Sequence, residues 1–257
     1  MKGIILAAGK GLRLNGHSGN TPKCLMEIGG QTLLERQIRA LRLCGVEEII
    51  VVVGYEAGRV RQSCDAEIRF VENPCYEQTN SLFSLWLTRE FLAAGFIVMN
   101  ADVLFHSQLL ADLIASPHED ALLIDYRDPL SARLGDEEMK VRVRGDRVVD
   151  ISKGIKPEEA DGENVGIGKF GLDGARLLVE EMNALIARGC YRDWAPRAFC
   201  EFARRRPLYA VSTGGQPWIE IDFPEDYQRA VNDILPRISL SLEDDSSTEP
   251  LTMAQQV

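Results

Sequence analysis

The sequence predicts an α/β fold with a mixed, mostly parallel central sheet flanked by helices. Runs of apolar and β-branched residues alternate with stretches of helical periodicity through the first part of the chain. This alternation favours parallel strands that are covered by helices on both faces. Polar residues and glycines also follow the apolar runs directly, at Gly9, Gly54 and Asp102. Ligands bind beyond the carboxyl ends of the strands in such sheets, so these positions predict a shared site.

The first half of the chain carries the clearest strand patterns. Strands are expected at residues 2–8, 48–53, 67–71 and 96–99. The second of these is an unbroken β-branched run that ends at Gly54, as is typical of buried strands. A helix is expected at 32–44, where leucine and isoleucine recur at roughly helical spacing, and another at 81–92.

The second half changes character. Residues 140–144 and 147–151 are expected to form a hairpin because Gly145-Asp146 joins them. The other expected strands are 121–126, 165–170, 208–212 and 218–221, and the expected helices are 174–188, 193–204 and 224–232.

Length and composition bound the organisation of the chain. The 257 residues are 45% hydrophobic and 26% charged, with a formal net charge of -10. We expect one domain over 1–238, built from two halves at about 1–120 and about 121–238. The acidic tail, 239–257, is expected to be disordered.

An acidic chain without a basic face is not expected to bind nucleic acid, and no apolar run predicts a membrane span. The scattered cysteines predict reduced thiols in a cytoplasmic protein.

A glycine turn follows the first strand. Gly9 and Gly11 allow a tight turn or a close approach to a ligand, and Arg13 and Lys23 add two cations downstream. This combination is typical of a polyphosphate site. An ordinary turn with solvent-exposed cations would show the same sequence pattern. Neither a P-loop nor the dinucleotide fingerprint is present.

Carboxylates mark a second candidate feature. Asp102 follows a buried strand directly, and Glu220 and Asp222 project to the same face if their segment is extended. Carboxylate oxygens are the ligands by which proteins hold Mg²⁺ for phosphoryl chemistry. The alternative is an edge strand with solvated acids.

Several blocks resemble a known enzyme group. Leu6-Ala7-Ala8-Gly9-x-Gly11-x-Arg13-Leu14 with Pro22-Lys23 resembles the signature of nucleotidyltransferases that make activated sugars and alcohols from an NTP. The stretch 74–85, with Thr79-Asn80 and Ser84-Leu85, resembles the corresponding block of phosphocholine-type cytidylyltransferases. Further matching blocks lie at 139–141, 151–153, 166–170 and 218–222, so the resemblance spans residues 2 to about 230.

Three positions depart from the group's pattern. Gly16-His17-Ser18 replaces the usual segment after Arg13-Leu14, Ala101 replaces a glycine, and Ser81 replaces a second asparagine. None of these departures removes a charged residue.

The resemblance implies a Rossmann-like, GT-A-like nucleotidyltransferase fold with an acceptor-binding subdomain. It implies that the half at about 1–120 binds the nucleotide and that the half at about 121–238 binds the acceptor. It implies CMP transfer from CTP to a small phosphorylated alcohol or phosphonate, with Mg²⁺ as cofactor. The implied catalytic residues are Arg13, Lys23, Asp102 and Lys153. The implied nucleotide-binding residues are Leu6, Ala7, Ala8, Gly9, Gly11, Arg13, Lys23, Thr79, Asn80 and Asp102. The implied acceptor-binding residues are Tyr126, Lys140, Lys153, Gly166, Tyr191, Trp194, Trp218 and Glu220. The implied metal ligands are Asp102, Asp222 and Glu220.

The sequence leaves open which acceptor and which nucleotide the protein uses. A quaternary ammonium would favour an aromatic cage, for which the sequence offers Trp86, Tyr126, Tyr191, Trp194 and Trp218, with Asp125 as a counter-charge. An acidic acceptor would instead favour Arg127, Arg133 and Lys169. A sugar-1-phosphate nucleotidyltransferase using UTP, dTTP or GTP and a catalytically silent nucleotide-binding regulator are the alternative functions. A homodimer is compatible with each of them.

Overall fold

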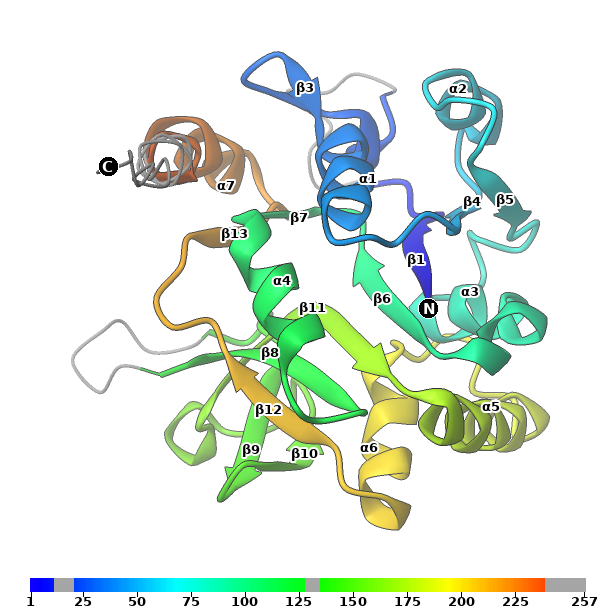
Figure 1. Ribbon diagram of the computed structural model, residues 1–257, viewed down its shortest axis with the longest axis vertical. Coiled ribbons are helices and arrows are strands. Elements are labelled where there is room, and N and C mark those ends of the chain that lie inside the picture. Colours follow the sequence, from blue (N-terminus) through cyan, green and yellow to red (C-terminus); the bar gives the residue numbers. More distant parts are fainter. Residues whose placement is uncertain (12–20, 128–134, 239–257) are drawn as a thin grey trace, which may run out of the picture.

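The computed structural model describes residues 1–11, 21–127 and 135–238. Within these residues, one nine-stranded sheet has the order β5-β4-β1-β6-β11-β8-β12-β10-β9 (Figure 1). Its strands are β1 (Lys2–Ala7), β4 (Ile49–Val53), β5 (Arg69–Glu72), β6 (Phe96–Asn100), β8 (Ala121–Tyr126), β9 (Lys140–Arg144), β10 (Arg147–Ile151), β11 (Gly162–Phe170) and β12 (Tyr209–Ser212). These nine strands match all the expected strands but 218–221, which lies outside this sheet, and the predicted α/β fold is confirmed.

Most of the strands run in one direction. β1 pairs in parallel with β4 and β6, and β8 pairs in parallel with β12. β11 is antiparallel to both β6 and β8, and β10 is antiparallel to both β12 and β9. Consequently the carboxyl ends of β1, β4, β6 and β8 meet at the same edge of the sheet, together with the start of β11.

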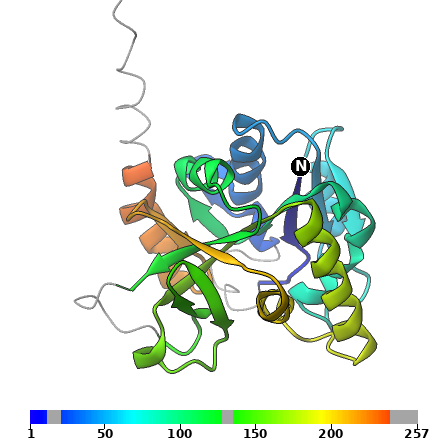
Figure 2. The same cartoon turned by 60° about the horizontal axis from the view of Figure 1, so that its bottom comes forward.

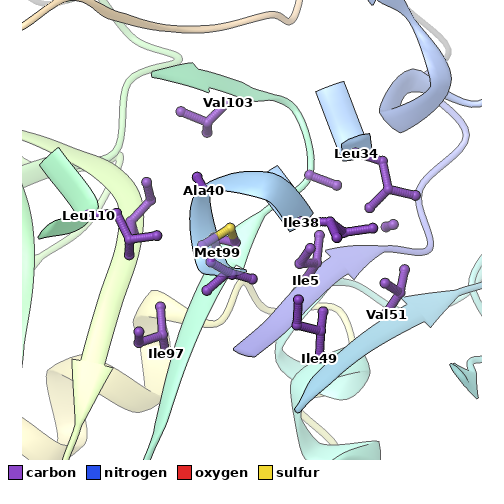
Figure 3. Packing of buried hydrophobic residues seen from close by; sticks show 14 of the residues in the cluster. Ile5, Leu34, Ile38, Ala40, Ile49, Val51, Ile97, Met99, Val103 and Leu110 are labelled. Carbon is purple, nitrogen blue, oxygen red and sulfur yellow. The ribbon is translucent and has the colours of Figure 1, made fainter. Parts of the chain in front are cut away.

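Helices cover both faces of the sheet. α1 (Leu33–Leu43), α2 (Ala57–Gln62) and α4 (Ser107–Ala115) pack on one face, where Ile5, Val51 and Met99 point (Figure 3). α3 (Ser81–Leu87), α5 (Leu172–Ala187) and α6 (Pro196–Arg205) pack on the other face, and α5 and α6 lie side by side (Figures 1 and 2). Because successive strand residues point to opposite faces, adjacent residues such as Ile4 and Ile5 belong to different core layers.

A third, smaller cluster joins distant parts of the chain. β13 (Trp218–Glu220) pairs antiparallel with β7 (Val103–Phe105), and the short hairpin of β2 (Glu27–Ile28) and β3 (Gln31–Thr32) lies nearby. Helix α7 (Pro224–Arg229) continues into η5 (Ala230–Ile234), which closes this cluster. The C-terminal part of the fold is thus attached to the segment that follows β6.

Some elements differ from the expected ones. The helix expected at 81–92 ends at Leu87, because the Thr88 hydroxyl donates to the Leu85 carbonyl and a 3₁₀ turn, η3 (Arg89–Ala94), follows. α2, α4, β7 and the β2–β3 hairpin were not expected, since each is short and has a weak periodic signal. The shorter 3₁₀ turns are η2 (Lys23–Leu25) and η4 (Pro157–Glu159).

The predicted tail, 239–257, lies outside the described residues. Among the described helices, none combines the length and apolar character that a bilayer span requires. The division into a nucleotide half and an acceptor half stays a prediction, although the sheet runs across both.

Candidate active site

A cleft of about 580 Å³ opens at the edge where β1 and β6 end. Its walls come from the turn after β1, the segment leading into α3, the turn after β6 and the residues around β13. This is the edge of the sheet at which the sequence predicted a site. Segments more than a hundred residues apart in the chain therefore face one another across one hollow.

The turn after β1 is held by backbone contacts. Ala101 N–H donates to the Leu6 carbonyl and Tyr55 N–H donates to the Ala8 carbonyl. Gly11 has φ +62°, and a Cβ built on it would lie 3.1 Å from the Lys23 Cβ. Only glycine adopts that backbone conformation at low cost, so Gly11 lets the turn pack directly against the lysine side chain.

The wall opposite this turn depends on a buried asparagine. Asn73 is 1% exposed, and its amide donates to the hydroxyls of Thr79 and Ser84 at 3.0 Å each. Asn80 caps α3, because its side chain accepts a hydrogen bond from the Ser81 N–H. These bonds fix the predicted residues Thr79 and Asn80 in the cleft wall.

Three carboxylates meet at the base of the cleft. Asp102, Glu220 and Asp222 each offer one oxygen, and these oxygens lie within 4.8 Å of one another. The β13–β7 ladder brings them together, since Glu220 pairs with Val103 and the Ile221 N–H donates to the Asp102 carbonyl at 3.0 Å. Asp226 accepts the N–H groups of Asp222 and the next residue, which fixes the start of α7.

Lys23 lies between two of these carboxylates. Its Nζ is 2.9 Å from Asp102 Oδ2 and 2.5 Å from Asp222 Oδ1. Burial alone would lower the pKa of Lys23, but the two carboxylates outweigh it and raise the pKa above its ordinary value. Burial raises the pKa of Glu220 well above the usual carboxyl range, and the charges of Asp102 and Asp222 add to this effect. Asp102 Oδ1 is buried and accepts no hydrogen bond within the described structure.

A second cation, Lys153, lines the cleft, and the sequence predicted that it binds the acceptor. Lys153 Nζ is 3.1 Å from Glu137 Oε2 and 5.0 Å from the centre of the Trp194 ring. Cys24 also lines the cleft, but burial raises the pKa of its thiol to about 12. A protonated thiol is a poor nucleophile, so the site is suited to direct transfer rather than to a thiol-linked intermediate.

Most of the predicted site residues line this one cleft. They are Leu6, Ala7, Ala8, Gly9, Gly11, Lys23, Thr79, Asn80, Asp102, Lys153, Trp194, Glu220 and Asp222. Arg13 lies outside the described residues. Trp218 lines a neighbouring hollow that shares Glu220 and Asp222 with the cleft.

The structure does not bring four predicted acceptor residues to the walls of either hollow. Lys140 is 1% exposed, and its ammonium donates to the carbonyls of Gly135 and Glu138. Gly166 packs against Asn100, and Tyr191 reaches the site only through its carbonyl, which accepts the Asn80 N–H. Tyr126 is exposed at the end of β8. Each supports or borders the site rather than lining it.

Two of the cations weighed for an acidic acceptor are committed elsewhere. Lys169 Nζ donates to the Ile114 carbonyl and to Ser116 at the end of α4, and Arg127 donates to the Pro157 carbonyl. Arg133 lies outside the described residues.

Sequence reasoning missed several residues of the cleft wall. They are Lys10, Asn73, Tyr76, Glu77, Ser84, Asn100, Glu137, Met139, Asn164 and Pro196. Asn73 and Asn100 stand at the carboxyl ends of β5 and β6, so the strand-end argument that selected Asp102 would also have found them. Glu137 and Asn164 carried no comparable local signal.

Comparisons with known proteins give a consistent result. Residues 3–151 match the model of the MobA-like NTP transferase domain. A bifunctional IPC transferase and DIPP synthase of Rubrobacter xylanophilus is 32% identical over 86% of this chain, which spans about half (49%) of that relative. The choline-phosphate cytidylyltransferase of Streptococcus pneumoniae is 28% identical, with 89% of this chain and 96% of the relative covered.

Solved structures agree with the fold. A CTP:phosphocholine cytidylyltransferase from Streptococcus pneumoniae has a TM-score of 0.73 at 25% identity, covering 89% of this chain and 96% of that one. An inositol-1-phosphate CTP transferase from T. maritima has a TM-score of 0.75 at 22% identity, covering 93% and 96% respectively.

Proposed function

Because the chain belongs to the family of MobA-like NTP transferase domains, we propose that it is a Mg²⁺-dependent cytidylyltransferase. It transfers CMP from CTP to a small phosphorylated alcohol or phosphonate, and pyrophosphate leaves. An oxygen of the acceptor phosphate attacks the α-phosphorus of CTP, and the bond from that phosphorus to the pyrophosphate oxygen breaks.

One observation carries this proposal. Asp102, Asp222 and Lys23 meet at the base of the same cleft whose other wall is the glycine turn after β1. Nucleotidyl transfer needs a phosphate-binding turn, carboxylates for a cation and a lysine within one cleft.

The carboxylate cluster fits a hard divalent cation. Its oxygens lie within 4.8 Å of one another, and Asp102 Oδ1 is buried without a hydrogen-bond donor, as expected of an atom that serves as a ligand. Asp102 and Asp222 would hold Mg²⁺, with Glu220 beside them. Bound there, the ion would supply charge neutralisation at the phosphates.

The protein's own residues then position the reactants. The backbone of residues 6–9 lines the base and ribose, and Gly11 lies beside the outer phosphates. The contact expected of Arg13 with those phosphates stays a prediction from the sequence. Lys23 stabilises the charge that develops at the α-phosphate, because its buried ammonium is fixed at the base of the cleft. Lys153 orients the acceptor phosphate from the opposite wall. Catalysis is therefore positioning and electrostatic stabilisation, without a covalent intermediate.

The choice of CTP and of the acceptor class is supported by the relatives. Those covered over most of their length include a choline-phosphate cytidylyltransferase and a CTP:phosphoglutamine cytidylyltransferase. Both names state a phosphorylated small acceptor and CMP transfer.

The direct test is a matrix of nucleotides and acceptors. The full chain with Mg²⁺ and each of the four common NTPs is incubated with phosphocholine, phosphoethanolamine, aminoethylphosphonate, inositol phosphate and sugar 1-phosphates, and pyrophosphate release is measured. We expect release with CTP and a non-sugar acceptor. Release with only UTP and a sugar 1-phosphate would replace this proposal by a sugar nucleotidyltransferase. No release from any pair would favour a silent nucleotide-binding regulator.

A further inference from the structure

A buried glutamine holds the turn that carries Asp102. Gln37 belongs to α1 and is 1% exposed. Its side-chain amide donates to the carbonyls of Asn100 and Val103, at 2.9 Å each. These carbonyls belong to the last residue of β6 and the first residue of β7, and Ala101 and Asp102 lie between them. One amide group therefore binds both ends of the turn.

Gln37 stands on an otherwise apolar face of α1. The other buried residues of this helix are Leu33, Leu34, Ile38, Ala40 and Leu41. The Oε1 of Gln37 is buried and has no hydrogen-bond partner in the described structure. A buried acceptor without a donor costs stability, and an unbranched methionine would fill a similar volume without that cost. Packing alone therefore does not account for a glutamine here, whereas the two bonds from its amide nitrogen do.

The turn that this glutamine holds positions all three clustered carboxylates. Asp102 belongs to the turn itself. Val103, which accepts one of the two amide bonds, pairs with Glu220 in the ladder of β7 and β13. The Ile221 N–H donates to the Asp102 carbonyl, which places Asp222 beside the same turn. The position of the turn therefore fixes the positions of all three acids.

The three carboxylates need a fixed backbone because they repel one another. Their oxygens lie within 4.8 Å of one another. Burial raises the pKa of Glu220, and the charges of Asp102 and Asp222 raise it further, which shows the strength of this repulsion. Lys23 offsets part of it. A turn that is free to move would let the acids spread apart before a cation arrives, and ligands that are held in place beforehand bind more tightly.

The other hydrogen bonds that hold the turn come from backbone groups. Ala101 N–H donates to the Leu6 carbonyl in β1, and Ile221 N–H donates to the Asp102 carbonyl. These bonds do not depend on the side chain at position 37. Loss of the Gln37 amide should therefore loosen the turn locally and leave the sheet intact.

We propose that Gln37 is a positioning residue for the metal site. By binding both ends of the turn, it keeps the carboxylates of Asp102, Glu220 and Asp222 at the separation that a divalent cation requires. Gln37 is not among the residues that line the cleft, so it acts through the turn and not on the nucleotide. This inference rests on the proposed function, because the cation is part of the proposed reaction.

Gln37→Met tests the proposal, because it removes the amide donor at nearly constant volume. Amide hydrogen exchange of the ligand-free protein, followed by mass spectrometry, should become several-fold faster in the segment 100–105 and stay unchanged in β4. The Mg²⁺ concentration for half-maximal turnover should rise about tenfold, as when a group that orients a metal ligand is lost. At saturating Mg²⁺, the KM for CTP should stay that of the wild type.

Leu41→Ala is the matched control. Leu41 lies one helical turn further along α1, is fully buried and packs against Gly3 near the start of β1. This variant should lose stability through the cavity it leaves, while its Mg²⁺ requirement and the exchange of 100–105 stay unchanged. Gln37→Asn is a second test variant, because its amide is one methylene too short to bind both carbonyls. It should behave like Gln37→Met and keeps the test open if Gln37→Met does not fold.

Three results would overturn the positioning role of Gln37. The first is an unchanged Mg²⁺ requirement in a folded Gln37→Met or Gln37→Asn, the second is unchanged exchange of 100–105, and the third is an equal Mg²⁺ shift in Leu41→Ala. Each of these would leave the cytidylyltransferase standing as long as the wild type turns over CTP. No turnover by the wild type with any nucleotide and acceptor would remove the proposed function and this inference with it.

Discussion

At the scale of single residues, Lys23 holds two of the clustered carboxylates in place. Its ammonium bridges Asp102 and Asp222, which lie more than a hundred residues apart in the sequence. The lysine therefore provides the positive charge that lets two acids stand side by side in a partly buried site. Its side chain also packs against Gly11, so the glycine turn after β1 and the carboxylates are linked through one residue.

Lys23→Ala should lower kcat by about 10²–10³-fold, the usual loss when one stabilising donor of a transition state is removed. The far-UV CD spectrum should stay that of the wild type, because the helices and strands do not depend on this side chain. Lys156→Ala, on the exposed surface, is the control and should keep wild-type kcat. A near-normal kcat in Lys23→Ala would contradict its assignment.

Glu163 makes the stability of the ligand-free protein depend on pH. Its folded pKa is about 8 and its unfolded value is near 4.5, so unfolding releases a proton between these two values. Stability contributed by this group therefore falls as pH rises from 4.5 to 8. Glu163→Gln has no carboxyl group to ionise, so it removes the free-energy cost of holding this charge in the folded protein.

The expected result is a Tm for Glu163→Gln that exceeds the wild-type Tm at pH 8.5 by ~2–4 °C for each kcal/mol of penalty removed. At pH 4.5 the two Tm values should agree. Thermal unfolding of both proteins and of Glu158→Gln, a control at an exposed glutamate of the same half, across this range measures the difference. A Tm difference that does not change with pH would show that Glu163 is ionised in the folded state throughout.

At the scale of elements, the pairing of β13 with β7 builds the carboxylate cluster. Three residue pairs form this ladder, and Ile219 is buried beneath it, at 6% exposure, in the cluster with Leu104. The positions of Glu220 and Asp222 relative to Asp102 thus depend on a short strand whose own hydrogen bonds are few. Packing of Ile219 compensates for the short ladder.

Ile219→Ala should destabilise the fold by about 2–5 kcal/mol and raise the Mg²⁺ concentration needed for half-maximal activity. Ile68→Ala is the matched control, since Ile68 has the same 6% exposure but packs in the cluster around α1 and α2. It should lose comparable stability while its Mg²⁺ requirement stays unchanged. Denaturant unfolding and Mg²⁺ titration of turnover measure the two quantities, and an equal Mg²⁺ shift in both variants would argue against the role of β13.

At the scale of the whole molecule, the sequence predicted where the site lies better than it predicted which residues line the site. The ends of β1 and β6 are marked locally by glycine and aspartate, and parallel strands force such ends to one edge. Pairings between distant segments have no local signature, so the position of β11 between β6 and β8 could not be predicted. The direction of a side chain depends on register, which is why Lys140 and Gly166 were expected to contact the acceptor and instead support the wall.

The attachment of β13 to β7 also has a consequence for synthesis on the ribosome. The glycine turn, Lys23 and Asp102 leave the exit tunnel early, whereas Glu220 and Asp222 follow more than a hundred residues later. A nascent chain can therefore form the glycine turn long before it has a complete set of carboxylates. Any activity that needs all three carboxylates can therefore begin only after β13 has been made and has paired with β7.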